Sequence, residues 1–304
     1  MESVKQFFEK LFHRGPKIER VDIRKRFDLI GRVGQGSMSK VWRARDVVSG
    51  RMVALKVLDK EKTLRLESRF QKLNKPKEGE VAITLRHPNV VKTLEHGITL
   101  DDEQFLVMEF IEGVGLSYLV DVQNERMQKN RLSYMIQLGD AIDYLHRQNY
   151  IHRDICPRNV VVGEDDVLKL IDFGLVVPNT PPFQAPGNRT GTANYMAPEL
   201  ISRQRTDTRI DIFSYAVTCY EMVCKRLPWP ATDSFESALA HVNNPPDDIR
   251  DHATGIDSQV ADAIMKGLAR FPADRWQRVS LMVEEFRQAA QRLGLPDGPP
   301  ARNE

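Results

Sequence analysis

A glycine-rich stretch near the start of the chain, GQGSMSKV at residues 34–41, has the composition of a phosphate-binding loop. Gly34 and Gly36 carry no Cβ, so backbone N–H groups there can closely approach phosphate oxygens. The stretch lies between two predicted strands, which separates it from a dinucleotide fingerprint or a Walker loop, where a helix follows. Glycine pairs are also common in ordinary hairpin turns, so this stretch indicates phosphate chemistry only together with further residues.

A lysine on a predicted strand is the second feature that could do chemistry. Lys56 ends VALK, fifteen residues after Val41. A lysine in the core of a lobe is costly unless it meets a negative charge, whereas an outward-facing lysine needs no partner. The order of a glycine hairpin followed by V-A-x-K favours a kinase.

Three further motifs follow in order: HRDICPRN at 152–159, DFG at 172–174 and APE at 197–199. Each is common by itself, but their order and spacing together are very hard to obtain by chance. With them the sequence resembles the eukaryotic-like, or Hanks-type, serine/threonine protein kinase family over about residues 27 to 291. The GTANYMAPE stretch and the compact form are most similar to the bacterial members of that family.

The resemblance implies roles for four residues of these motifs. Asp154 would orient the substrate hydroxyl or accept its proton, and Lys56 would hold the α- and β-phosphates of ATP. Asp172 would hold Mg²⁺, and Asn159 would hold the same or a second ion, with Mn²⁺ as a substitute metal. Carboxylate and amide oxygens suit such a hard cation.

The resemblance also implies a nucleotide pocket between two lobes. Lys56 would be held by Glu78, with Glu80 as the competing candidate. Pro76 would lie in the first turn of a shortened helix, which Gly79 would weaken by up to about 1 kcal/mol. The other pocket residues would approach the phosphates, enclose the adenine or bond its edge: Val33, Gly34, Gly36, Val41, Ala54, Met108, Glu109, Ile111 and Val161.

Two positions depart from the family pattern. Ser39 replaces the third glycine of the phosphate loop, so we expect weaker or altered ATP binding. Cys156 replaces the lysine of H-R-D-L-K-P-x-N, and a thiol cannot supply a cation. Arg158 could take over that charge in catalysis, because arginine is permanently charged and forks onto phosphate. Alternatively, Arg158 is a solvated surface side chain, or it repels basic residues of the substrate. Cys156 itself is either inert or, near Arg153 and Arg158, a reactive thiol of lowered pKa.

Substrate choice and regulation depend on a further group of residues. Thr192, in GTANYMAPE, favours serine or threonine as the acceptor, although the catalytic loop is partly similar to that of tyrosine kinases. In the family, an arginine such as Arg153 meets a phosphorylated residue of the activation segment. The hydroxyl candidates are Thr180 and Thr190, and a phosphate beside Arg153 would order the segment.

The resemblance implies two structural anchors in the large lobe. Asp211, in DIFSYA, would brace the catalytic loop from a buried helix. Arg275, in ADRW, would form a buried ion pair with Glu199 of the APE motif, and truncating one partner would be strongly destabilising.

The rival interpretation is a pseudokinase scaffold that binds nucleotide or partners without efficient catalysis. Cys156, Ser39 and the interrupted helix around Pro76 favour it. Against it stands a complete set of catalytic residues, namely Lys56, Asp154, Asn159 and Asp172. A metabolite kinase is less favoured, because GTANYMAPE is typical of peptide binding.

Periodicity supports an α+β, bilobal fold. Five β-rich stretches predict strands, at 27–36, 39–46, 51–58, 90–98 and 104–111. Four stretches predict helices, at 132–148, 208–224, 257–269 and 280–293. The expected architecture is a small antiparallel β-sheet lobe with one main helix at 27–110 and a larger, mostly helical lobe at 111–293.

Two segments flank the lobes. Residues 1–26 form a basic extension with eight Lys/Arg against four Asp/Glu. Five apolar residues in it have helical spacing: Val4, Phe7, Phe8, Leu11 and Phe12. Residues 3–14 therefore predict an amphipathic helix that docks on its own domain or a partner or, less favoured, contacts a membrane surface. The polar, proline-rich tail at 294–304 is expected to be disordered.

Composition excludes several classes of protein. A formal net charge of +2 over 304 residues argues against nucleic acid as the main partner. The three cysteines form no disulfide framework, which indicates a reducing compartment. No apolar run approaches the ~18 residues that a membrane span needs, and no secretory signal is visible. We expect a cytoplasmic protein that acts on protein substrates, with its oligomeric state left open.

Overall fold

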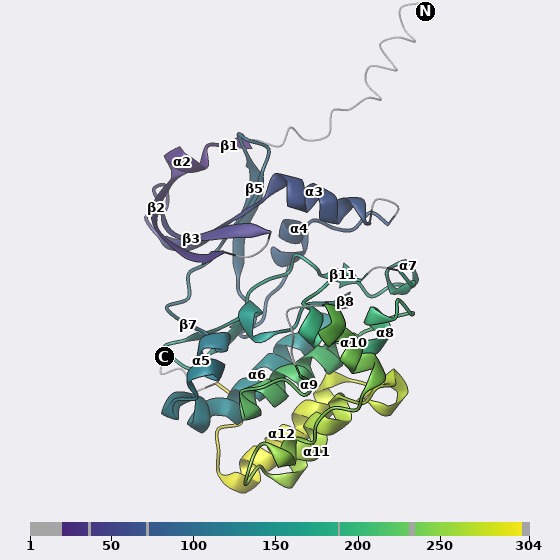
Figure 1. Ribbon diagram of the computed structural model, residues 1–304. Coiled ribbons are helices and arrows are strands. Elements are labelled where there is room, and N and C mark those ends of the chain that lie inside the picture. The colour runs from purple at the N-terminus through teal and green to yellow at the C-terminus, as the bar shows by residue number, and fades with distance from the viewer. Residues whose placement is uncertain (1–19, 36–37, 71–72, 188, 231–234, 300–304) are drawn as a thin grey trace, which may run out of the picture.

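Figure 1 shows the computed structural model, in which a β-sheet dominates the upper lobe and helices dominate the lower lobe. The structure describes residues 20–35, 38–70, 73–187, 189–230 and 235–299. The predicted α+β, bilobal fold class is confirmed. The predicted helix at 3–14 and Gly36 of the phosphate loop lie outside the described residues.

The small lobe is built on a six-stranded sheet in the order β1-β5-β6-β4-β3-β2. Five antiparallel strands match the predicted ones: β2 (Phe27–Gln35), β3 (Ser39–Asp46), β4 (Met52–Leu58), β5 (Thr93–Thr99) and β6 (Gln104–Glu109). The sixth strand, β1 (Arg20–Val21), runs parallel to β5 and is followed by α2 (Ile23–Arg26). The sheet therefore includes Arg20 and Val21, which belong to the segment predicted as an extension. The sequence did not reveal this strand, because two residues are too few to show periodicity.

Two short helices connect β4 to β5. They are α3 (Lys60–Ser68) and α4 (Glu78–Ala82). Pro76 precedes α4 instead of lying in its first turn as predicted. The physical reason is the cap: the Glu80 carboxylate accepts a hydrogen bond from the Lys77 N–H at 2.9 Å, which makes Lys77 the N-cap.

Gly79, predicted to weaken α4, has a packing role. A Cβ on Gly79 would lie 2.6 Å from the His96 side chain on β5. Only glycine therefore lets α4 sit this close to the sheet, and the contact offsets the cost of glycine in a helix.

The large lobe is mostly helical. Its helices are α5 (Leu116–Val122), α6 (Glu125–Arg147), α7 (Pro181–Gln184), α8 (Pro198–Ile201), α9 (Arg209–Cys224), α10 (Phe235–Asn243), α11 (Ser258–Gly267) and α12 (Val279–Leu293). α6 begins earlier than predicted, because the Asn124 side chain accepts a hydrogen bond from the Met127 N–H and caps it. The prediction did not include α10.

Short strands complete the large lobe next to the small one. β7 (Gly113–Gly115), β9 (Val160–Gly163) and β10 (Leu168–Leu170) form one sheet. β8 (Tyr150–Ile151) pairs with β11 (Val177–Pro178). These strands flank the HRD and DFG motifs, so they set the positions of both loops.

Alternation along β4 decides which way Lys56 faces. Val53, Leu55 and Val57 enter a small core cluster on one face of the sheet. Ala54 and Lys56 therefore face the opposite side, where Ala54 packs against the main hydrophobic core that continues through the large lobe.

The described part of the C-terminal segment contacts the large lobe. Residues 294–299, from the segment predicted as a disordered tail, are described. The Ser133 hydroxyl of α6 donates a hydrogen bond to the Gly298 carbonyl at 2.8 Å. Within the described ranges, no helix combines the length and apolar character needed to span a lipid bilayer.

Candidate active site

Lys56 is the centre of a buried cluster of charges. Its Nζ lies 2.6 Å from Glu78 Oε1 on α4 and 3.0 Å from Asp172 Oδ1. The competing Glu80 instead caps its own helix. Burial by itself would lower the Lys56 pKa, but the carboxylates of Asp172 and Glu78 raise it overall. The lysine therefore stays charged and binds both acids.

The two carboxylates of this cluster differ in their access to solvent. The Glu78 side chain is 6% exposed, whereas that of Asp172 is 40% exposed. Burial raises the pKa of Glu78, and Lys56 offsets this only in part. Burial by itself would raise the pKa of Asp172, but Lys56 and the Gly174 N–H lower it by more. The Gly174 N–H donates to Asp172 Oδ1 at 3.0 Å, and the pKa of Asp172 is lowered overall. Asp172 is therefore an anionic oxygen donor that a ligand can reach.

Asp154 is held from two sides. Asn159 Nδ2 donates to its backbone carbonyl and to its Oδ2, both at 2.8 Å. The Thr192 N–H and hydroxyl donate to its Oδ1 at 2.8 and 2.7 Å. Gly191 makes this approach feasible: its φ is 135°, and a Cβ there would lie 2.6 Å from the Arg153 carbonyl. Gly191 was not predicted, although a glycine between two threonines was the available signal.

Backbone pairing brings Asn159 close to Asp172. The N–H of Ile171, the neighbour of Asp172 in the chain, donates to the Asn159 carbonyl at 3.0 Å. Because Asn159 uses its NH₂ group toward Asp154, its amide oxygen is the group that can serve as a ligand. A carboxylate and an amide oxygen in this position fit a hard divalent cation such as Mg²⁺.

Asp211 on α9 braces the catalytic loop as the resemblance implied. It is fully buried, and its carboxylate accepts hydrogen bonds from the His152 N–H at 2.7 Å and the Arg153 N–H at 2.8 Å. His146 Nε2 lies 2.9 Å from the same carboxylate. Arg153 has a φ of 70°, a strained conformation for a residue with a side chain, which these bonds hold in place.

Cys156 lies where the family pattern has a lysine. Its Sγ is 4.0 Å from Thr192 Oγ1, and the residue is 1% exposed. Burial and the negative Asp154 raise the pKa of the Cys156 thiol to about 12. Burial and Asp154 outweigh the opposing effect of Arg158 on that pKa, so the surroundings of Cys156 favour an unreactive thiol over a reactive one.

Arg158 is exposed in the turn Pro157–Asn159. Its charge acts on the Glu221 carboxyl of α9. Burial raises the pKa of Glu221, while the Tyr195 hydroxyl, which donates to it at 2.5 Å, and the charge of Arg158 lower it in part. Sequence reasoning missed Glu221; the available signal was a single acid within the apolar run of a buried helix.

Arg153 belongs to a basic site beside the activation segment. Its guanidinium is buried and donates to the Phe183 carbonyl through Nη2 at 2.9 Å. Among the residues that the structure describes, its Nε and Nη1 have no hydrogen-bond partner. Lys75 is a second cation here: its Nζ donates to the Gly174 carbonyl at 3.1 Å, and burial, together with Arg153, lowers its pKa. No sequence pattern singles out Lys75.

The two candidate phosphorylation sites lie on segments that contact Arg153. Thr180 is half-buried and immediately precedes α7, where its carbonyl accepts a hydrogen bond from the Phe183 N–H at 2.9 Å. Thr190 is 5% exposed and adjoins Gly191, which packs on the Arg153 backbone. Thr180 is thus the more accessible of the two hydroxyls.

Glu199 and Arg275 form the expected ion pair. Arg275 donates from Nη1 and Nη2 to the two carboxylate oxygens at 2.7 and 2.8 Å. The side chains are 0% and 4% exposed for Arg275 and Glu199, respectively. Arg275 also donates to the carbonyls of Ala269, Arg209 and Arg270. This network joins the APE motif to the distal part of the large lobe.

The residues expected around adenine lie where the two lobes meet. Ala54 on β4 is opposite Met108 on β6, and both contact the main core. Ile111 packs against the same core, just before β7. Val161 on β9 pairs with Gly115 on β7. Because β7 follows β6 in the chain, this pairing brings Val161 next to the segment that leaves β6.

The phosphate loop is described only in part. Gly34 on β2 pairs with Val41 on β3, and Val33 is 53% exposed. Ser39 is buried at the start of β3. At the hinge, Glu109 Oε1 accepts hydrogen bonds from the Lys92 N–H and Lys169 Nζ, and the Glu109 N–H donates to the Lys92 carbonyl at 3.0 Å.

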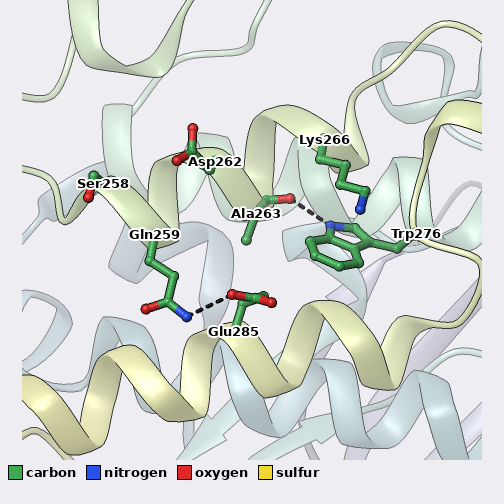
Figure 2. A pocket seen from close by; sticks show the side chains of 7 residues that line it. All are labelled: Ser258, Gln259, Asp262, Ala263, Lys266, Trp276 and Glu285. Atoms are coloured by element: carbon green, nitrogen blue, oxygen red, sulfur yellow. Dashed lines mark hydrogen bonds between the residues drawn. The ribbon is translucent and has the colours of Figure 1, made fainter.

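A separate cavity of about 280 Å³ lies between α11 and α12, as Figure 2 shows. Lys266 Nζ lies 3.8 Å from the centre of the Trp276 ring, and Trp276 Nε1 donates to the Ala263 carbonyl at 3.0 Å. Gln259 donates to Glu285 across the two helices at 2.7 Å. These contacts hold α11 on α12, and the residues that line the cavity include none from the catalytic loop.

Comparison with known proteins agrees with this geometry. The family model of the protein kinase domain matches residues 27–287. A probable serine/threonine-protein kinase of Clostridium perfringens is 31% identical over 86% of this chain and 38% of its own length. The serine/threonine-protein kinase PknA of Corynebacterium glutamicum is 32% identical over 80% of this chain and 52% of its own length. The Aurora kinase of Saccharomyces cerevisiae is 30% identical over 82% of this chain and 65% of its own length.

The chain spans about half or less of the length of these bacterial relatives. The matched segment contains every catalytic motif, and the buried charge cluster and the braced catalytic loop lie within it. Members of the family use ATP with a divalent metal and act on protein substrates. The chain belongs to the protein kinase family.

Proposed function

We propose that this chain is an ATP- and Mg²⁺-dependent kinase that transfers the γ-phosphoryl group to serine or threonine hydroxyls of proteins. One observation carries the proposal: Lys56, Glu78 and Asp172 converge within 2.6 and 3.0 Å from three distant parts of the sequence. Burying a lysine and two carboxylates has a desolvation cost, so such a cluster contributes little to stability and is more readily explained by function. Binding a polyphosphate and its metal ion is a function that needs these charges.

Each residue of the site has a defined task in this proposal. When bound, Mg-ATP supplies the phosphoryl group to be transferred. Lys56, positioned by Glu78, binds phosphate oxygens, while Asp172 and Asn159 are the oxygen ligands for the cation. Asp154, oriented by Asn159 and Thr192, accepts a hydrogen bond from the substrate hydroxyl and then its proton.

The hydrogen bonds of Thr192 favour serine and threonine as acceptors. In the family, serine/threonine kinases use the threonine at this position to bond the catalytic aspartate, and Thr192 donates twice to Asp154. Peptide substrates should therefore enter along the segment that carries Thr192.

A transfer assay tests the proposal. Labelled phosphate should pass from Mg-ATP to a generic basic protein, and phosphoamino-acid analysis should find phosphoserine and phosphothreonine. Chelation of the divalent metal should stop the reaction. Repeating the assay with Mn²⁺ instead of Mg²⁺ tests whether Mn²⁺ also supports transfer. Nucleotide binding without transfer would instead support the pseudokinase scaffold, and phosphotyrosine as the main product would contradict the proposed acceptor.

Replacing Arg158 with alanine should lower kcat by about a hundredfold. The reason is that Cys156 supplies no cation, so Arg158 is the charge available to the transferring phosphoryl group, and one such preorganised group contributes on the order of 3 kcal/mol. Replacing Cys156 with lysine should be tolerated, because it restores the charge of the family pattern. Steady-state kinetics of both variants provides the measurement.

Arg250→Ala is the matched control for Arg158, because Arg250 is an exposed arginine that pairs with Asp262 far from the catalytic loop. A fully active Arg158→Ala variant would show that Arg158 is only a surface residue. A peptide array tests the third role, in which Arg158 repels basic residues of the substrate. A preference for arginine upstream of the acceptor would refute that role.

Phosphorylation of the activation segment should increase activity. Incubation with Mg-ATP should add phosphate to Thr180 or Thr190, because the unpaired donors of Arg153 and the nearby Lys75 can bind it. Alanine at the modified threonine should lower the transfer rate by about 5- to 150-fold, the range of a coupling free energy of about 1–3 kcal/mol. Mass spectrometry identifies the site, and absence of phosphate at both threonines would count against this regulation.

A further inference from the structure

A groove behind α4 is the strongest feature that the proposed mechanism does not use. It has a volume of about 140 Å³ and lies between α4 and strands β5 and β6. Its lining residues are Lys77, Gly79, Glu80, His96, Gly97, Ile98, Gln104, Phe105 and Leu106. The groove therefore opens on the side of α4 that faces the sheet, one residue away from Glu78.

Two glycines let the chain segments around the groove approach each other closely. A Cβ at Gly79 would lie 2.6 Å from His96, and one at Gly97 would lie 2.8 Å from the Phe105 ring. α4 has only five residues, so its stability depends on packing and not on its own hydrogen bonds. Whatever fills the groove therefore bears directly on how firmly Glu78 is held.

The first described residue lies beside this groove. β1 pairs in parallel with β5, with Arg20 opposite Ile98, and Ile98 lines the groove. Arg20 is therefore placed next to a residue of the groove, and the segment before it is attached at that point. Eight positions separate Phe12 from Arg20, and an extended chain of that length reaches roughly 26–29 Å, which is ample for a neighbouring groove.

The sequence before Arg20 has the chemistry to fill the groove. Apolar side chains recur in it with helical spacing, at Val4, Phe7, Phe8, Leu11 and Phe12. The groove offers Ile98 and Leu106 as apolar floor, and its rim carries both signs of charge, on Lys77 and Glu80. Lysines and a glutamate also alternate with the aromatic residues of the segment.

We propose that residues 4–12 dock their apolar face in the groove between α4 and β5–β6 of the same chain. The docked segment braces α4 and so holds Glu78 on Lys56. The consequence for catalysis rests on the proposed function, whereas the docking is independent of it. The segment is thus an intramolecular activator and not primarily a membrane anchor or a dimer contact.

Photo-crosslinking of the full chain tests the docking. Benzoylphenylalanine in place of Phe8 should crosslink within the same chain to peptides from residues 77–80 or 96–106, identified by mass spectrometry. Ile98→Glu should lower the yield at least about fivefold because it places a charge on the apolar floor. Leu100→Glu, at an exposed position just beyond β5, is the matched control and should leave the yield unchanged.

Hydrogen exchange provides a readout on α4. Replacing Phe7 and Phe8 with serine should make α4 amides exchange at least about tenfold faster, since local opening becomes easier. Replacing Lys5 and Lys10 with serine should not. Crosslinks to a second copy, or to peptides outside the groove, would overturn the proposal. Anionic vesicles provide the other critical outcome: the proposal also fails if adding them abolishes the groove crosslinks and the chain co-sediments with the vesicles. Groove crosslinks in a chain without transfer activity would support docking and refute only the proposed function.

Discussion

Replacing Asp172 with asparagine should reduce phosphoryl transfer by about a thousandfold. The substitution removes the negative charge that lies 3.0 Å from Lys56 Nζ and is the most accessible oxygen donor of the cluster. Loss of one preorganised electrostatic group costs ~10²–10³ in rate, and Asp172 in addition supplies the charged ligand of the cation. Transfer of labelled phosphate at saturating Mg-ATP measures the effect.

The control for this variant is Asp262→Asn, which makes the same chemical change on a side chain that is 73% exposed and pairs with Arg250. It should retain full activity. Circular dichroism should show that both variants are folded, since Lys56 keeps its contact with Glu78 in each. Asp172→Asn with more than about a tenth of normal activity would rule out the assigned role of Asp172.

Replacing Glu199 with alanine should lower the free energy of unfolding by about 3–5 kcal/mol. The variant leaves the guanidinium of Arg275, which is fully buried, without its bidentate carboxylate partner. An unpaired buried charge is far costlier than the loss of one hydrogen bond, because no water replaces the missing partner. Urea denaturation followed by tryptophan fluorescence gives the measurement.

Glu285→Ala is the matched control for Glu199. The Glu285 carboxylate accepts a hydrogen bond from Gln259 on the surface between two helices, so its loss should cost less than about 1 kcal/mol. Glu199→Gln, which keeps the size of the side chain but not its charge, should fall between the two. Equal stability of Glu199→Ala and Glu285→Ala would mean that the pair contributes nothing beyond a surface contact.

The residues of the site were predictable because phosphoryl transfer demands particular side chains in short motifs. Lys56, Asp154, Asn159 and Asp172 each stand at a fixed place within a local pattern of the sequence. Strand alternation likewise predicted five strands of the small lobe, because a half-buried strand repeats every two residues. By contrast, β1 is two residues long and leaves no such repeat.

The choice between Glu78 and Glu80 required the tertiary structure. The two residues are two positions apart on α4, so their side chains point about 200° away from each other around the helix. The contact of Gly79 with His96 sets the rotation of α4, which directs Glu78 to Lys56 and leaves Glu80 to cap the helix. Nothing local in the sequence encodes that rotation.

The sequence by itself determined the family, the chemistry and the side chains that carry it, because these depend on residue types and on short spacings. Only the tertiary structure decided that Cys156 is buried, that Lys75 contacts the DFG glycine, and that Arg20 pairs with a strand of the small lobe. Burial, electrostatic pairing and strand partners are properties of residues that are distant in the chain and close in space. They arise only when the core brings those residues together.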